Sequence, residues 1–170
     1  MYHHYTVDEH LLRTVGNLIA IESGDLATEL PLSTSIVKSI QSRRALYVAA
    51  FLHDIGKGRK EDHSTVGARI AKKLCPRLGL TAAETDLIVW LIEEHLTMSN
   101  IAHSRDISDP ATVRKFADIV QSPERLKLLL LLTCADIRAV GPGVWNGWKG
   151  QLLRTLYHET ELLVAGGHTQ

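Results

Sequence analysis

The chain of 170 residues has no excess of either charge, because 19 lysines and arginines balance 19 aspartates and glutamates. Without a net charge there is no overall field to recruit nucleic acid or an anionic membrane, so we expect neither as a partner. Long apolar runs are also missing. The longest, Leu128 to Cys134, is far shorter than the roughly 20 residues that a membrane-spanning helix needs. The opening segment MYHHYTVDEH lacks the charged and then apolar layout of a secretory signal.

Cysteine is scarce as well. Cys75 and Cys134 are the two in the chain, both stand in apolar stretches, and no CxxC spacing pairs them. This usage favours reduced, buried thiols in a cytoplasmic protein. The length suits one domain, which we expect to span residues 1–170.

What is present is a helical pattern, and no strand pattern, internal repeat or low-complexity segment competes with it. Two capping boxes and two pairs of a capping residue with proline mark helix starts: Thr6–Glu9, Thr81–Glu84, Asp109-Pro110 and Ser122-Pro123. Apolar residues at helical spacing extend the prediction to a helix from Val7, a short one opening at Pro31, and helices over about 43–57, 62–75, 81–95, 110 onward, 123–140 and 148–164. The expected ends are Gly56 with Gly58, Pro76 with Gly79, and Gly166 with Gly167. We therefore expect an all-α fold of about seven to eight helices, with the helix over 123–140 at its centre because it is apolar on nearly every side.

Histidines and aspartates interrupt these apolar helices: His10, the pair His53-Asp54 in HDIGK, His95, and Asp136 in LTCADIR. An ionised aspartate in an apolar core costs several kcal/mol unless a positive group meets it. We expect neither Lys57 nor Arg138 to be that group, because each is on the same helix as its aspartate. Adjacent helical residues diverge by about 100°, so His53 and Asp54 can share one ion only if it lies between them. A shared metal ion would satisfy all of these side chains.

Other interpretations of these residues stay open from the sequence. His10 lies at the edge of an apolar stripe, where a histidine can be a hydrogen-bonded packing residue. Asp136 can instead belong to a buried hydrogen-bond network. His63 and His95 can be helix-end histidines that face water.

The order H…HD…D resembles the signature of the HD superfamily of metal-dependent phosphohydrolases, and the apolar lead-in LYVAAFLHDIGK is a close local match. The resemblance implies an HD-domain helical bundle whose metal ligands are His10, His53, Asp54 and Asp136. HSTVGA resembles the H-x-x-x-G-A stretch of relatives with six ligands, which adds His63. The expected cofactor is Mg²⁺ or Mn²⁺, with Fe and Zn as alternatives, at one or two ions per chain.

His95 ends WLIEEH, where such relatives usually carry two adjacent histidines, and Glu94 occupies the earlier position here. With His63 and His95 included, the resemblance implies a two-metal site. Glu94 is either a substitute ligand or proton acceptor, or a solvated helix residue.

This chemistry predicts a hydrolytic mechanism. A divalent ion lowers the pKa of a bound water towards neutrality, and a second ion or a histidine neutralises phosphate oxygens and assists the leaving group. The catalytic residues expected are Asp54, Lys57, His63 and His95. Lys57 follows His53-Asp54 by one turn and can reach a phosphate, or it can complement the helix dipole instead.

Six further motifs follow one another over about residues 2–158: YTVDEH, HDIGKGR, DHS, EHLTMS, RDISDP and ADIR…VWNGWK. As a set they resemble the HD domain of the bifunctional enzymes that attach UMP to, and remove it from, the nitrogen-regulatory PII protein. The resemblance implies hydrolysis of the phosphodiester between UMP and a PII tyrosine, with uridylylated PII as the partner. It also implies a domain excised from a longer chain that carries a nucleotidyltransferase domain before it and ACT domains after it.

Two tryptophans and two arginines fit a protein substrate. Trp145 and Trp148, beside the Gly141-Pro142-Gly143 turn, would supply an apolar docking surface, or would pack in the core to hold the last helix. Arg105 and Arg138 would contact phosphate or an acidic loop, or form ordinary ion pairs. Two other functions stay open: a phosphohydrolase of free nucleotides, and a regulatory module that keeps its metal without turnover.

Overall fold

The computed structural model describes residues 6–57, 62–141 and 143–165, and no strand occurs within these ranges. The all-α prediction is therefore confirmed. The helices in chain order are α1 (Val7–Ser23), α2 (Pro31–Ile36), the 3-10 turn η1 (Val37–Ser39), α3 (Arg43–Leu52), α4 (His63–Arg77), α5 (Ala82–Glu93), α6 (Thr97–Ser104), α7 (Pro110–Val120), α8 (Pro123–Ala139) and α9 (Gly147–Val164).

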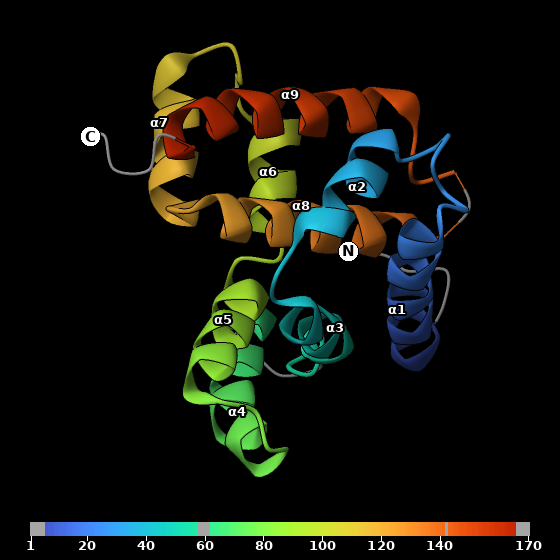
Figure 1. The fold of residues 1–170 in the computed structure, drawn as a ribbon, viewed down its shortest axis with the longest axis vertical. Coiled ribbons are helices and arrows are strands. Elements are labelled where there is room, and N and C mark those ends of the chain that lie inside the picture. Colours follow the sequence, from blue (N-terminus) through green and yellow to red (C-terminus); the bar gives the residue numbers. More distant parts are fainter. Residues whose placement is uncertain (1–5, 58–61, 142, 166–170) are drawn as a thin grey trace.

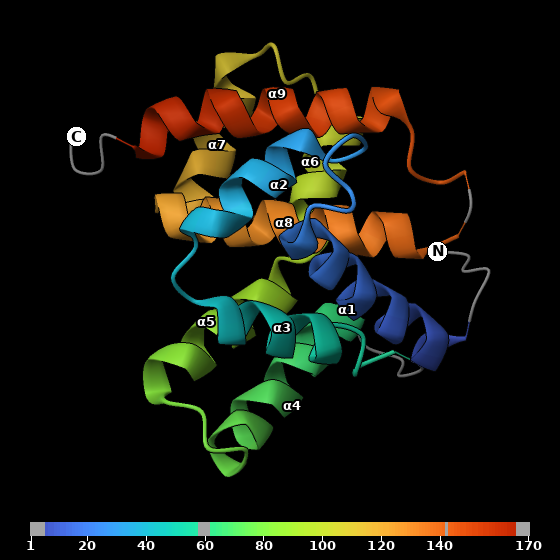
Figure 2. The same cartoon turned by 45° about the vertical axis from the view of Figure 1, so that its right-hand side comes forward.

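Helix α8 lies at the centre of the bundle. Figures 1 and 2 show α3, α4 and α5 grouped on one side of it and α2, α6, α7 and α9 on the other, with α1 packed against both α8 and α3. The run from Leu128 to Ala135 is buried throughout. A helix that is apolar all round is stable only when neighbours cover every face, which accounts for its position.

The predicted helix starts are confirmed. At Thr81 the reciprocal bonds of a capping box with Glu84 are both present. At Thr6 the side chain accepts the backbone N–H of Glu9, but the Glu9 carboxylate bonds to the Thr6 hydroxyl rather than to its backbone. The side chains of Asp62, Asp109 and Ser122 likewise cap α4, α7 and α8. Caps are local interactions, so the sequence predicts them well.

Helix ends are predicted less well. The helix predicted over 43–57 ends at Leu52, and residues 53–57 form turns instead. Helix α4 continues through Pro76 to Arg77, because the Leu78 N–H still bonds to the carbonyls of Leu74 and Cys75. The expected ends at Gly58 and Gly166-Gly167, and Pro142 of the predicted turn, lie outside the described residues.

Helix α6 was not predicted. It is short, no side chain caps its start, and only Met98 and Ala102 are fully buried along it. A helix without a cap or a long apolar stripe depends on its neighbours for stability, so its sequence signal is weak.

Cys75 and Cys134 are buried free thiols, as predicted. Among the described helices, none combines the length and the apolar character that crossing a membrane would require.

Candidate metal centre

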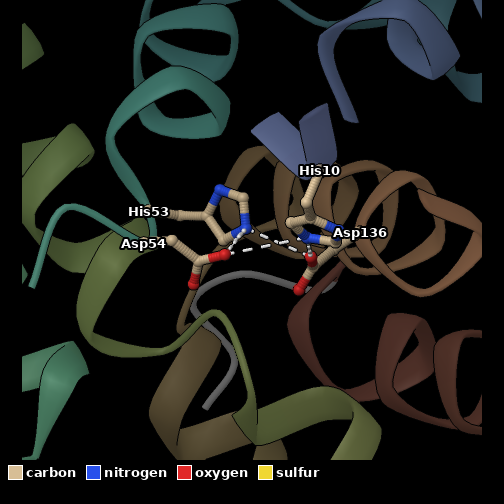
Figure 3. Close-up of side chains that lie close together, drawn as sticks. All are labelled: His10, His53, Asp54 and Asp136. Carbon is tan, nitrogen blue, oxygen red and sulfur yellow. Dashed lines mark hydrogen bonds and ion pairs between the residues drawn. The ribbon is translucent and has the colours of Figure 1, made fainter. Parts of the chain in front are cut away.

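Six predicted site residues converge from five places in the fold. His10 lies on α1, His53 and Asp54 follow α3, His63 begins α4, His95 follows α5, and Asp136 lies on α8. Figure 3 shows that His10, His53, Asp54 and Asp136 point towards one another. All but His63 and Asp136 are fully buried. The structure thus brings together residues that are far apart in the sequence.

Four of these side chains form the first cluster, which consists of His10, His53, Asp54 and Asp136. Asp136 Oδ1 lies 2.6 Å from His10 Nε2 and 3.1 Å from His53 Nε2. Asp54 Oδ2 lies 3.3 Å from His53 Nε2. One ligand atom from each residue lies within 4.8 Å of the others. Two imidazoles and two carboxylates at this spacing fit a divalent ion with nitrogen and oxygen ligands.

Asp54, His63 and His95 form the second cluster. Here the other carboxylate oxygen of Asp54, Oδ1, lies 3.8 Å from His63 Nε2 and 3.9 Å from His95 Nε2. The two oxygens of Asp54 therefore face two different sets of histidines. Asp54 would thus offer one oxygen to an ion held by each cluster.

Backbone carbonyls orient three of the four imidazoles. Nδ1 of His53 donates to the carbonyl of Ala50, and Nδ1 of His95 donates to that of Ile92, each at 2.7 Å. Nδ1 of His10 lies 3.2 Å from the Ala139 carbonyl. Since a carbonyl only accepts, these bonds place the proton on Nδ1 and turn Nε2 towards the clusters, as in many metal sites.

The electrostatics of the first cluster suit a cation. Burial alone would lower the pKa of His53, but the Asp136 and Asp54 carboxylates outweigh it and raise that pKa to about 10. Burial would likewise raise the pKa of both carboxyls, yet the charge of His53 helps to hold the pKa of Asp136 well below its usual range and that of Asp54 at about 2. Burial, and then the charge of His53, lower the pKa of His95. The two carboxylates therefore stay ionised, and a positive charge is favoured between them.

One expectation about nearby cations was wrong. Lys57 Nζ lies 3.5 Å from Asp54 Oδ2, so a lysine does meet this carboxylate. The two residues are three positions apart, a spacing at which side chains are neighbours, and the Asp54 carbonyl also accepts the Lys57 backbone N–H. Arg138 behaves as expected, because its guanidinium bonds to Glu29 and Asn17 instead of Asp136.

Gly56 explains how His63 comes so close to Asp54. A Cβ built on Gly56 would overlap the backbone carbonyl of His63 and would lie 2.7 Å from the backbone nitrogen of Gly67. Only glycine allows the turn after α3 to touch the first turn of α4. This backbone contact positions the second cluster beside the first.

Glu94 takes no part in either cluster within the described residues. It caps the end of α5, and its carboxylate accepts a 2.6 Å hydrogen bond from the Thr97 hydroxyl. This contact favours a structural role over that of a substitute ligand. Arg105 is exposed at the end of α6.

A cleft that the sequence did not reveal adjoins both clusters. It has a volume of about 250 Å³ and reaches from the ligands His95 and Asp136 to α6 and the start of α9. Trp145 packs against the core, whereas Trp148 is 65% exposed and stacks on His103, a residue of the cleft wall, with ring centroids 6.4 Å apart. The core-packing alternative thus holds for Trp145 but not for Trp148.

Comparison with protein-family models matches residues 7–122 to the HD domain. The match contains five of the six predicted ligands, and Asp136 lies beyond it. Members of this family are generally metal-dependent phosphohydrolases, and the donor set described above fits that chemistry. The match covers most of the chain, which therefore belongs to the HD-domain family.

Proposed function

We propose that this protein is a metal-dependent phosphodiesterase that removes UMP from a uridylylated tyrosine of the PII signalling protein. The observation that carries the proposal is the position of Asp54, whose two carboxylate oxygens lie between two clusters of potential ligands. Two-metal sites of this kind suit in-line displacement at phosphorus, because both the attacking and the leaving oxygen need charge stabilisation.

The potential ligands fall into two sets, one for each ion. His10, His53, Asp136 and one oxygen of Asp54 would hold one ion, and His63, His95 and the other oxygen of Asp54 would hold the second. When bound, divalent ions supply Lewis-acid charge that polarises phosphoryl oxygens and activates water.

Lys57 and His63 are suited to contact the phosphate charge and to transfer protons. The Lys57 ammonium, beside Asp54, can contact a non-bridging phosphate oxygen. His63 is the ligand with the greatest exposure, 26% of its side chain, so it is suited to exchange protons with solvent. The carbonyl bonds of His53 and His95 hold the imidazoles in place during these steps.

Support for PII as the substrate comes from the sequence. Six motifs recur in order along residues 2–158 in the HD domains of PII-uridylylating and -deuridylylating enzymes. We propose on the same ground that this domain works between a nucleotidyltransferase domain and ACT domains.

A direct test incubates the purified protein with uridylylated PII and Mn²⁺ or Mg²⁺ and measures released UMP by chromatography. We expect UMP release with unmodified PII as the second product, and no release by Asp54→Asn. Asp25→Asn is the matched control, since Asp25 is exposed in the turn after α1 and touches neither cluster.

The same experiment includes a panel of free nucleotides. Hydrolysis of free nucleotides without UMP release from PII would contradict the proposed substrate and favour the general phosphohydrolase. Metal binding without any turnover would favour the regulatory module.

A further inference from the structure

The cleft beside the metal centre has polar groups that neither cluster uses. One end is formed by Asp136 of the first cluster and His95 of the second. A phosphoryl group at this end would therefore face both clusters. The rest of the wall combines apolar side chains of α8 and the following segment, such as Ile137 and Val140, with Ser99, His103, Thr133 and Lys149. The cleft thus continues away from the reacting centre into a mixed polar and apolar pocket.

Thr133 is the first of these unused groups. Its side chain is 1% exposed, and within the described residues its hydroxyl has no hydrogen-bond partner. Helical threonines commonly bond to the carbonyl four residues earlier, as Thr14 and Thr34 do here. Rotation about the Cα–Cβ bond changes which substituent of the Thr133 Cβ, the hydroxyl or the methyl, faces the cleft. Buried polar groups without partners are uncommon and call for an explanation, of which a bound ligand is one.

His103 is the second polar group of the cleft that neither cluster uses. Its Nδ1 lies 3.2 Å from the Ser99 hydroxyl, while its Nε2 is buried and meets no group of the described chain in hydrogen-bond geometry. The Lys149 carbonyl lies near enough to raise the pKa of His103 somewhat, yet burial dominates and lowers it. A neutral imidazole offers one donor and one acceptor. His103 can therefore bond to either kind of group on a ligand edge.

Lys149 gives the cleft a positive charge. Its backbone N–H bonds to the Asn146 side chain at the start of α9, and none of the ion pairs found among the described residues involves its ammonium. With cations bound at the two clusters, these ions and the Lys149 ammonium would make the cleft favour an anionic ligand.

We propose that this cleft binds the nucleoside of a pyrimidine nucleotide, with the Thr133 hydroxyl and the His103 imidazole as the groups that recognise the edge of the base; this assignment rests on the proposed phosphodiesterase function. The volume of about 250 Å³ is smaller than the roughly 300–1,000 Å³ of typical small-molecule pockets, which favours a one-ring base over a two-ring base. The tyrosyl side of the substrate fits less well, because a phenyl ring has no edge donors or acceptors and would leave both groups unpaired. The tyrosyl oxygen would then leave opposite the attacking water, while the nucleoside stays bonded to phosphorus in the cleft.

The test measures binding rather than turnover. The affinities of UMP, AMP, phenyl phosphate and inorganic phosphate for the Mg²⁺-loaded protein are determined by calorimetry. Thr133→Val keeps the shape and removes the hydroxyl, and His103→Phe keeps the ring and removes both nitrogens. We expect each to weaken UMP binding about fivefold to tenfold, the loss typical of one hydrogen bond, with AMP weaker than UMP for the parent protein.

Thr160→Val is the matched control. The Thr160 hydroxyl is also buried and has no partner in the part of the chain that the structure describes, but Thr160 does not line the cleft. Its replacement should leave UMP affinity unchanged. Thermal unfolding checks that each variant folds. If Thr133→Val does not fold, the UMP affinity of His103→Phe tests the proposal instead.

Three results would overturn the assignment: UMP affinity unaltered in both cleft variants, AMP binding as tightly as UMP, or phenyl phosphate losing as much affinity as UMP. The last would assign the cleft to the tyrosyl side. The binding test does not depend on turnover. If the parent protein bound UMP through these groups but released no UMP from PII, the proposed substrate would be contradicted and the assignment of the cleft would stand.

Discussion

His10 and Asp136 lie 126 positions apart in the chain, yet His10 Nε2 and Asp136 Oδ1 are separated by 2.6 Å. The contact depends on the packing of α1 against α8, which also buries Thr14 and Asn17 of α1. Nδ1 of the same imidazole meets the Ala139 carbonyl one turn further along α8. The first cluster therefore exists only when the two helices are docked.

We expect the fully loaded protein to hold two ions per chain, one for each cluster. His95→Ala should lower the metal content by about one ion and reduce the rate of UMP release by several orders of magnitude. Elemental analysis beside the parent protein measures this. His158→Ala is the control, since His158 is exposed on α9.

Equal metal content in His95→Ala and the parent would defeat the two-metal interpretation. His95 would then act as a proton carrier or phosphate donor, and the rate loss should be nearer the roughly 10²–10⁴-fold of a general acid or base.

Replacing His53 or Asp54 with alanine should abolish UMP release and leave the helical content nearly intact. The reason is that the buried residues of α3, such as Ala45, Leu46 and Ala49, belong to the hydrophobic core and supply no ligand atom to either cluster. Far-UV circular dichroism beside the UMP assay separates the two effects. A loss of helicity together with activity would show that the site is chiefly structural.

Metal binding should release protons and strengthen as the pH rises. Despite burial, Asp136 and Asp54 raise the pKa of His53 to about 10, so the metal-free protein carries a proton there at neutral pH. A metal ligand must give up that proton, so affinity should rise by up to about tenfold per pH unit until the pH approaches this pKa. Calorimetry in buffers of different ionisation enthalpy counts the protons, and an affinity independent of pH would contradict the prediction.

Gly56→Ala should destabilise the protein by about 1–3 kcal/mol, because its methyl group would overlap the backbone of His63 at the start of α4. The affinity of the second cluster for metal should fall as well. Urea unfolding measures the change in the free energy of unfolding.

Gly16→Ala provides the opposite control. Gly16 lies within α1, and beyond the backbone of its own helix no atom of the described residues comes within 4 Å of a Cβ built there, so alanine should stabilise the helix by about 0.5–1 kcal/mol. If Gly56→Ala were equally harmless, the turn after α3 would not need its close approach to α4.

Local chemistry made the helix starts predictable. Asp109 before Pro110 and Ser122 before Pro123 specify where α7 and α8 begin, because a cap and a proline act on the next few residues only. Helix α6 has neither signal, and its position follows from its contacts with α8 and α9. Likewise, the end of α3 at Leu52 was missed because the turn that follows packs on α4.

The all-α class and the kinds of side chain in the metal centre follow from local sequence, because apolar periodicity and isolated histidines and aspartates in apolar helices are visible residue by residue. The packing of the helices, in contrast, directs one oxygen of Asp54 towards each cluster and places Thr133 and His103 on the wall of one cleft. These relationships depend on how helices distant in the sequence pack together, and hydrophobic burial, which drives that packing, is not directional.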